Sequence, residues 1–83
     1  MKTWYLHVEA PILHKGIDLV VSENTTLEEL REVSASFMEK ETHGQFLAQK
    51  QTYLVRCLDH CFVFGKQRIQ DSDISNGEYF YLL

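Results

Sequence analysis

The sequence predicts an α+β fold in which one amphipathic helix packs against one face of a mixed sheet of four to five strands. Three observations predict it: two alternating segments near the N-terminus, one helix with a clear start signal, and a final segment rich in strand-forming residues. The chain has 83 residues, so we expect one domain covering residues 1–83. A single helix on one face of a sheet is the economical way to bury one apolar stripe.

The first two strands are predicted from alternation. Residues 3–9 alternate between apolar and polar side chains, as a half-buried antiparallel strand does. Residues 17–21 have the same period. The connection from Pro11 to Gly16 joins the two segments, which therefore read as a hairpin with a loop longer than the tightest types.

The helix has the clearest local signal in the sequence. Thr26 and Glu29 fit a capping box, in which a hydroxyl accepts a bond from a backbone amide and a carboxylate bonds back. Thr25 and Glu28 fit equally well, which leaves the cap open by one residue. Gly44 is a plausible stop for the helix. The expected apolar stripe at helical spacing consists of Leu27, Leu30, Val33, Phe37 and Met38.

The second half of the chain is expected to be mostly strand and loop. Strands are predicted over residues 53–58, 61–64 and 79–83. The intervening loop, residues 66–77, is polar except for Ile69 and Ile74, which we expect to anchor it to the core, and it ends in an Asn76-Gly77 turn signal. The last strand should then lie beside the first one, in parallel, which is the β-grasp arrangement.

Composition and charge exclude several classes of partner. The net charge of −4 argues against binding nucleic acid or an anionic membrane surface, since both require a basic patch. No segment approaches the roughly 18–20 apolar residues of a spanning helix, and His7 and Glu9 interrupt any signal-peptide core. We therefore expect a cytoplasmic protein without direct membrane insertion, whose two cysteines are free thiols.

Two parts of the sequence resemble a known family. The segment from Ile17 to Val21, followed by Thr26 to Leu30, looks like the second strand and helix start of ubiquitin. The segment from Ile69 to Phe80 resembles the YukD/EsaB-like pattern of an apolar residue, Asp, a buried Ile, Asn-Gly-Glu and the final strand. The whole chain is thus similar to ubiquitin-like proteins, and within them to the YukD/EsaB-like proteins of bacterial type VII (WXG100) secretion.

The resemblance implies a function. It implies a ubiquitin-like fold and a non-catalytic, cytosolic accessory or regulatory role in a Gram-positive secretion system, with membrane or ATPase subunits of that system as partners. Ubiquitin, its conjugated relatives and the sulfur carriers end in Gly-Gly, whereas this sequence ends in Tyr81-Leu82-Leu83. We therefore expect neither conjugation nor sulfur transfer. No nucleophile–base set is visible, so no enzyme and no cofactor are expected.

A partner-binding face is predicted on the side of the sheet opposite the helix. The residues expected to face the helix are Leu6, Val8, Val55, Phe80 and Leu82. The opposite face would then carry Tyr5, His7, Leu54, Arg56, Tyr79 and Tyr81. Tyr and Arg are over-represented at interface centres, and the corresponding face is the usual docking surface of ubiquitin-like folds. The alternative is that aromatic residues are simply good strand formers on an open sheet.

One cluster suggests a different kind of function. Cys57, His60 and Cys61 supply three soft ligands with C-x-x-H-C spacing, but a structural zinc site needs four. The fourth would have to come from His7, His14 or His43. Free cysteines are commonly buried small hydrophobes, so we expect no metal site. A small metal- or redox-responsive domain is kept as one alternative, and a ubiquitin-like subunit of an unrelated bacterial assembly as another.

Overall fold

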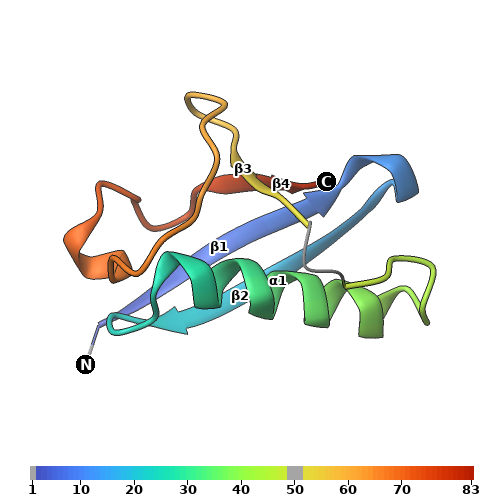
Figure 1. The fold of residues 1–83 in the computed structure, drawn as a ribbon, viewed down its shortest axis with the longest axis horizontal. Coiled ribbons are helices and arrows are strands. Elements are labelled where there is room, and N and C mark those ends of the chain that lie inside the picture. The colour runs from blue at the N-terminus through green and yellow to red at the C-terminus, as the bar shows by residue number, and fades with distance from the viewer. Residues whose placement is uncertain (1, 49–51) are drawn as a thin grey trace.

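The computed structural model describes residues 2–48 and 52–83 of the chain (Figure 1). In it, one helix lies across one face of a four-stranded sheet, and a long excursion connects the last two strands. The elements in chain order are β1 (Thr3–Ala10), a 3-10 turn η1 (Pro11–Leu13), β2 (Lys15–Ser22), α1 (Leu27–Glu41), β3 (Leu54–Arg56), a second 3-10 turn η2 (Ile69–Asp71) and β4 (Tyr79–Leu82).

The sheet has the strand order β2-β1-β4-β3. β1 pairs antiparallel with β2 and parallel with β4, and β4 pairs antiparallel with β3. The predicted α+β arrangement, with the last strand beside the first in parallel, is confirmed. The parallel pairing of β1 and β4 is possible because α1 and the long excursion lie between them in the chain.

The N-terminal hairpin follows the sequence alternation closely. β1 and β2 pair without a break from Thr3–Ser22 to Ala10–Lys15, so every second side chain of each strand reaches the same face. The connection is the turn η1, which Pro11 begins and which ends at His14 in the left-handed conformation, with φ of 51°. Alternation thus predicts both strands and the side chains that share a face.

The start of α1 is capped by Thr26. The Glu29 amide donates to the Thr26 hydroxyl at 3.1 Å, and the Thr26 amide donates to the Glu29 carboxylate at 3.0 Å. This is the complete capping box, and it decides between the two candidate caps. At the other end, the Gly44 amide donates to the Glu39 carbonyl from a left-handed backbone. No helix in the described ranges is long and apolar enough to cross a membrane.

The buried face of α1 differs from the predicted stripe. Val33 and Phe37 are 44% and 41% exposed, so their place in the predicted core stripe was wrong. Ser34 and Ala35 are buried instead. Small side chains allow a helix to approach a sheet closely, and this contact decides which face turns inward. The residues of α1 that are buried are Leu30, Ser34, Ala35 and Met38.

The region between β3 and β4 contains less strand than predicted. β3 has three residues, and the expected strand over residues 61–64 is reduced to a single bridge between Val55 and Phe62. A tight turn explains this, because the His60 amide donates to the Arg56 carbonyl at 2.8 Å and the His60 backbone is left-handed. Ile69 and Ile74 are both buried, so their predicted role as anchors of the long loop is confirmed.

Candidate functional site

The two faces of β3 are set by its pairing with β4. Leu54 pairs with Leu82, and both side chains lie in the core at 1% exposure. Val55 pairs with Tyr81, which is outside the core. The prediction that Leu54 faces outward was therefore wrong. Val55 lies on the side of Tyr81 rather than facing the helix, although its side chain is buried at 8% exposure. Leu54 and Val55 are adjacent and both apolar, so the sequence does not show which of them faces the core. Moving the strand register by one residue would exchange the two faces.

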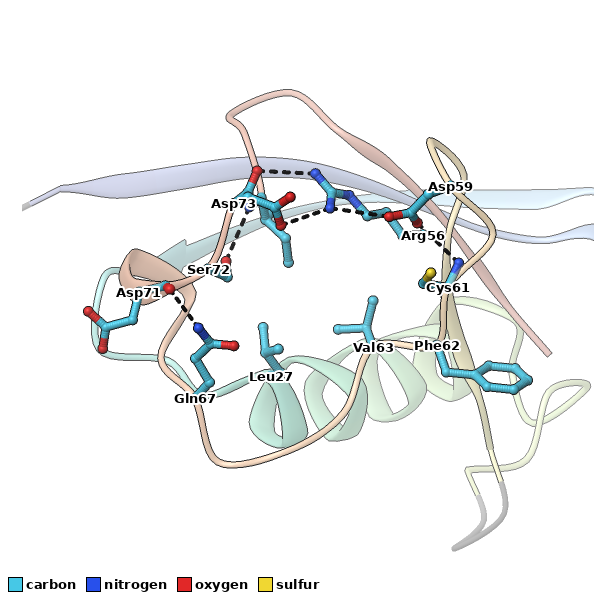
Figure 2. A pocket seen from close by; sticks show the side chains of 11 residues that line it. Leu27, Arg56, Asp59, Cys61, Phe62, Val63, Gln67, Asp71, Ser72 and Asp73 are labelled. Carbon is cyan, nitrogen blue, oxygen red and sulfur yellow. Dashed lines mark hydrogen bonds and ion pairs between the residues drawn. The ribbon is translucent and has the colours of Figure 1, made fainter.

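Arg56 is also misplaced by the prediction, because its side chain is buried. Its Nε and Nη2 donate to the two carboxylate oxygens of Glu78 at 2.6 and 2.7 Å. Its Nη1 donates to Asp73 at 2.9 Å and lies 3.6 Å from Asp59. Figure 2 shows the guanidinium between these last two carboxylates, at the wall of a shallow pocket. The hydrogen bonds from Arg56 hold the pKa of Glu78 below its usual value. Arg56 therefore fastens β3 to the loop before β4, which is a structural role.

The remaining predicted residues do share the outer face of the sheet. Tyr5 and Tyr79 are 61% and 59% exposed, and Tyr81 is 38% exposed. Val20 of β2 lies opposite Tyr5 and is also exposed. We call this surface the tyrosine face; it consists of Tyr5, His7, Val20, Val55, Tyr79 and Tyr81, and Val55 is its buried member at 8% exposure. Neighbouring members meet by strand pairing: Tyr5 with Val20, His7 with Tyr79, and Tyr81 with Val55.

His7 occupies the middle of the tyrosine face. Its Nδ1 lies 2.9 Å from the Asp18 carboxylate and its Nε2 lies 3.1 Å from that of Glu9. Ionised carboxylates only accept hydrogen bonds, so both contacts are satisfied when the ring carries two protons. The hydrogen bond to Asp18, with help from Glu9, raises the pKa of His7 above 6.5. The ring contacts Tyr79, with centroids 4.8 Å apart. It also passes over Gly16, where an added Cβ would lie 2.9 Å from two ring atoms.

The charge of this site is expected to depend on pH. A group whose pKa is raised by folding adds stability below its unfolded value, and this contribution disappears as pH rises through the folded pKa. We expect a His7 pKa above 6.5 in an NMR titration of the imidazole, and a lower one in Asp18→Asn. Since the carboxylates of Glu9 and Asp18 are 49% and 90% exposed, the stability involved is at most about 1 kcal/mol. An identical His7 titration in wild type and Asp18→Asn would contradict this assignment.

An aromatic extension of the tyrosine face lies beyond β3. Phe62 is bridged to Val55, and its ring centroid is 5.4 Å from that of Tyr53. Both rings are more than half exposed. Neither residue was predicted from the sequence to belong to a surface, and neither was Val20. The signal for Val20 was present, since it is an apolar residue at an outward position of an alternating strand. No local signal places Phe62, because its position depends on the turn after β3.

Comparison with known proteins bears on the fold. No protein-family model matches the chain, and no curated protein sequence is significantly similar to it. Among solved structures, the ubiquitin-like domain of an Arabidopsis thaliana protein, determined by solution NMR, aligns with a TM-score of 0.65 and 13% identity, over 100% of this chain and 78% of that chain. The protein has a ubiquitin-like β-grasp fold.

A second structural match comes from a different setting. A chain of the toluene 4-monooxygenase HD complex with the inhibitor 4-bromobenzoate aligns with a TM-score of 0.68 and 11% identity, over 98% of this chain and 96% of that chain. At such identities the similarity concerns the fold alone. The ubiquitin-like fold expected from the resemblance is therefore confirmed, and the tyrosine face is a feature of this chain's own residues.

The cysteines of this ubiquitin-like domain are not brought together with His60. Cys57 hydrogen-bonds to Tyr81 on the outer side of the sheet, and burial raises the pKa of its thiol. Cys61 lines the pocket near Arg56 and Asp59 on the other side (Figure 2). Within residues 2–48 and 52–83, no three His, Cys, Asp or Glu side chains are grouped so that they could hold a metal ion. A raised pKa also disfavours the reactive thiolate.

Proposed function

We propose that this ubiquitin-like domain is a non-catalytic accessory or regulatory component of a bacterial type VII secretion system, and that it acts by docking a partner protein on the tyrosine face. The observation that carries the proposal is the continuity of exposed apolar and aromatic side chains across β2, β1 and β4. Single exposed apolar residues are ordinary on a protein surface, whereas clustered ones mark interaction sites.

The chemistry of the tyrosine face suits protein docking. Tyr5, Tyr79 and Tyr81 each offer a large apolar ring with a polar tip, which is the side-chain type enriched at interface centres. Paired strands hold them, so little backbone order has to be gained on binding. His7, Asp18 and Glu9 add a polar, charged region beside the rings, which can select orientation.

The assignment to secretion rests on the resemblance of the Ile69–Phe80 segment to the YukD/EsaB-like pattern. In this chain that segment contains the anchors Ile69 and Ile74, the Asn76-Gly77 turn and the start of β4. It therefore positions Tyr79 on the tyrosine face. The expected partners are the membrane or ATPase subunits of the secretion system, met from the cytoplasmic side.

Binding to purified cytosolic domains of those subunits tests the proposal. We expect Tyr81→Asp and Tyr5→Asp each to weaken binding by about 30-fold or more, the effect of losing roughly 2 kcal/mol at an interface hot spot. Calorimetric titration measures the affinity, and circular dichroism checks the fold.

The matched control is Ile12→Asp, which changes an 85% exposed apolar residue of η1 outside the tyrosine face. It should bind as wild type does. Equal binding by all three variants would count against the tyrosine face, and no binding by wild type would count against the secretion partners.

A second candidate keeps the same docking face and places the domain in another assembly. The similarity to a chain of the toluene 4-monooxygenase HD complex supports it, since that chain of the same fold belongs to a complex. Affinity purification from the native cytosol separates the two candidates. Capture of secretion subunits by wild type, lost with Tyr81→Asp, favours the first; capture of the subunits of an enzyme complex with the same dependence favours the second.

A further inference from the structure

β2 is the strand at one end of the sheet, and its outer edge is unpaired from Gly16 to Val20 in the part of the chain that the structure describes. Within the described residues β1 is its one neighbouring strand. On the other side of β1, the His7 amide donates to the Glu78 carbonyl, and the Gly77 amide donates to the Tyr5 carbonyl. The backbone groups of the odd-numbered residues of β1 therefore point to the β4 side. Even-numbered residues of β1 then bond to odd-numbered residues of β2. The backbone groups of Gly16, Asp18 and Val20 therefore point away from the sheet.

This edge lacks the features by which proteins protect edge strands. β2 contains no proline, and its register with β1 has no bulge. The side chains that β2 directs toward the core are Ile17, Leu19 and Val21, and the one charged residue of the same parity, Lys15, is exposed at the end of the strand. Natural sheets use proline, bulges or inward charges to prevent pairing with another strand. An edge of eight residues without them is a template for one more strand.

The flank of α1 beside this edge is apolar. Glu28 and Arg31 line a pocket together with Leu54 of β3, so their side of the helix faces β3. Helical spacing places Val33 and Phe37 on the opposite flank, and β2 is the strand at the opposite edge of the sheet. Figure 1 shows α1 running beside β2. The two partly exposed side chains therefore extend the β2 edge as a second apolar element.

We propose that β2 and this flank of α1 form the interface of a symmetric homodimer, in which β2 pairs antiparallel with β2 of a second copy around Leu19. Charge favours this register over one centred on Asp18. Centred on Leu19, Asp18 lies opposite Val20 of the second copy. At both ends Lys15 lies opposite Glu23, the residue just after β2, whose carboxylate also accepts from the Lys2 amide at 3.4 Å. Centred on Asp18, that carboxylate would face its own copy, and like charges directly opposite are destabilising.

The resulting interface is self-complementary, as two-fold symmetry requires. Asp18 of one copy and Val20 of the other form a hydrogen-bonded pair, which uses the backbone groups that β2 leaves unpaired. Lys15 and Glu23 form a non-hydrogen-bonded pair, in which the two side chains lie closer together. Both helices then lie on one face of a continuous sheet. Val33 and Phe37 of one copy face those of the other across the axis. This proposal goes beyond the docking function, since it uses the edge of the sheet rather than the tyrosine face.

Sedimentation equilibrium over a range of concentrations tests the dimer and its register. We expect wild type to dimerise reversibly. Lys15→Glu should raise the dimer dissociation constant about tenfold or more, because each end then opposes two carboxylates. The exchange variant Lys15→Glu with Glu23→Lys should restore it to within about threefold, because the charge pair is rebuilt with opposite polarity.

Val20→Pro provides a second variant that spares the monomer. Its amide is directed to the free edge, so proline removes a donor that β1 does not use, as edge-strand prolines do. We expect a folded monomer by circular dichroism. Hydrogen exchange adds a residue-level readout: the amides of Gly16, Asp18 and Val20 should become more protected as wild-type concentration rises.

Three outcomes would overturn the proposal. A monomeric mass up to the solubility limit excludes the dimer. Dimerisation unaffected by Val20→Pro places any interface elsewhere, and failure of the double exchange to restore Lys15→Glu excludes the register around Leu19. Tyr81→Asp should leave the dimer unchanged, so loss of partner docking and loss of dimerisation are separable results.

Discussion

Leu54→Asp is expected to unfold the domain at 25 °C, whereas Leu58→Asp should leave its stability nearly unchanged. Leu54 is 1% exposed and lies in the core with Leu82. A carboxylate there would lie among apolar core side chains, and burying a charge that no partner neutralises costs more than about 4 kcal/mol. Small domains have about 5–15 kcal/mol of stability, and short chains lie near the lower end.

Circular dichroism with urea titration measures this difference. Leu58 makes the matched control because the same chemical change is made at a 74% exposed residue, where the effect should stay within about 0.5 kcal/mol. Leu54→Ala, which adds no charge, should cost about 2–5 kcal/mol through the cavity it leaves. A folded Leu54→Asp with wild-type stability would mean that β3 pairs with β4 in the other register.

Arg56→Met is expected to destabilise the domain by about 3–5 kcal/mol, because it leaves a largely buried carboxylate without its cation. Glu78, whose side chain is 12% exposed, receives two hydrogen bonds from Arg56. Asp73 is 87% exposed and water can replace its contact, so most of the effect should come from Glu78. The double variant Arg56→Met with Glu78→Gln should recover a large part of the loss, since it removes the unpaired charge.

A double-mutant cycle from urea titrations measures the coupling between Arg56 and Glu78. The same pair predicts an acid response. The pKa of Glu78 is lowered below 4.5 by Arg56, so its stabilising contribution is complete above that value and is lost as pH falls through the folded pKa. Glu78→Gln should lack this part of the acid dependence. Additive effects of the two substitutions would show that the ion pair does not hold β3 to the loop.

These two experiments also define the docking surface. If Leu54 and Arg56 are structural, substitutions there cannot report on partner binding, because they disturb the fold first. Tyr5, His7, Tyr79 and Tyr81 lie on the outer face as the sequence predicted, and their role in binding stays a prediction. Val20 and Val55 complete that face by pairing with Tyr5 and Tyr81.

Most of the fold could be predicted from local patterns. The alternation in residues 3–9 and 17–21 predicts both strands of the hairpin and which side chains are buried. The Thr26–Glu29 spacing predicts the start of α1, although only the structure separates it from the candidate one residue earlier. Ile69 and Ile74 stand out because the loop around them is polar. In each case the signal and the structure lie within a few residues of one another.

Tertiary structure decided the features whose partners are distant in sequence. Leu54 and Val55 are both apolar, so only pairing with β4 assigns one to the core and the other to the outer face. Asp73 and Glu78, whose carboxylates accept hydrogen bonds from Arg56, lie 17 and 22 residues after it in the sequence. No local sequence pattern predicts these contacts. On α1, close approach to the sheet favoured Ser34 over the larger Val33. Short-range spacing thus determined which elements form, while the register of the short strand, the inward face of the helix and the buried ion pair were decided by packing between distant segments.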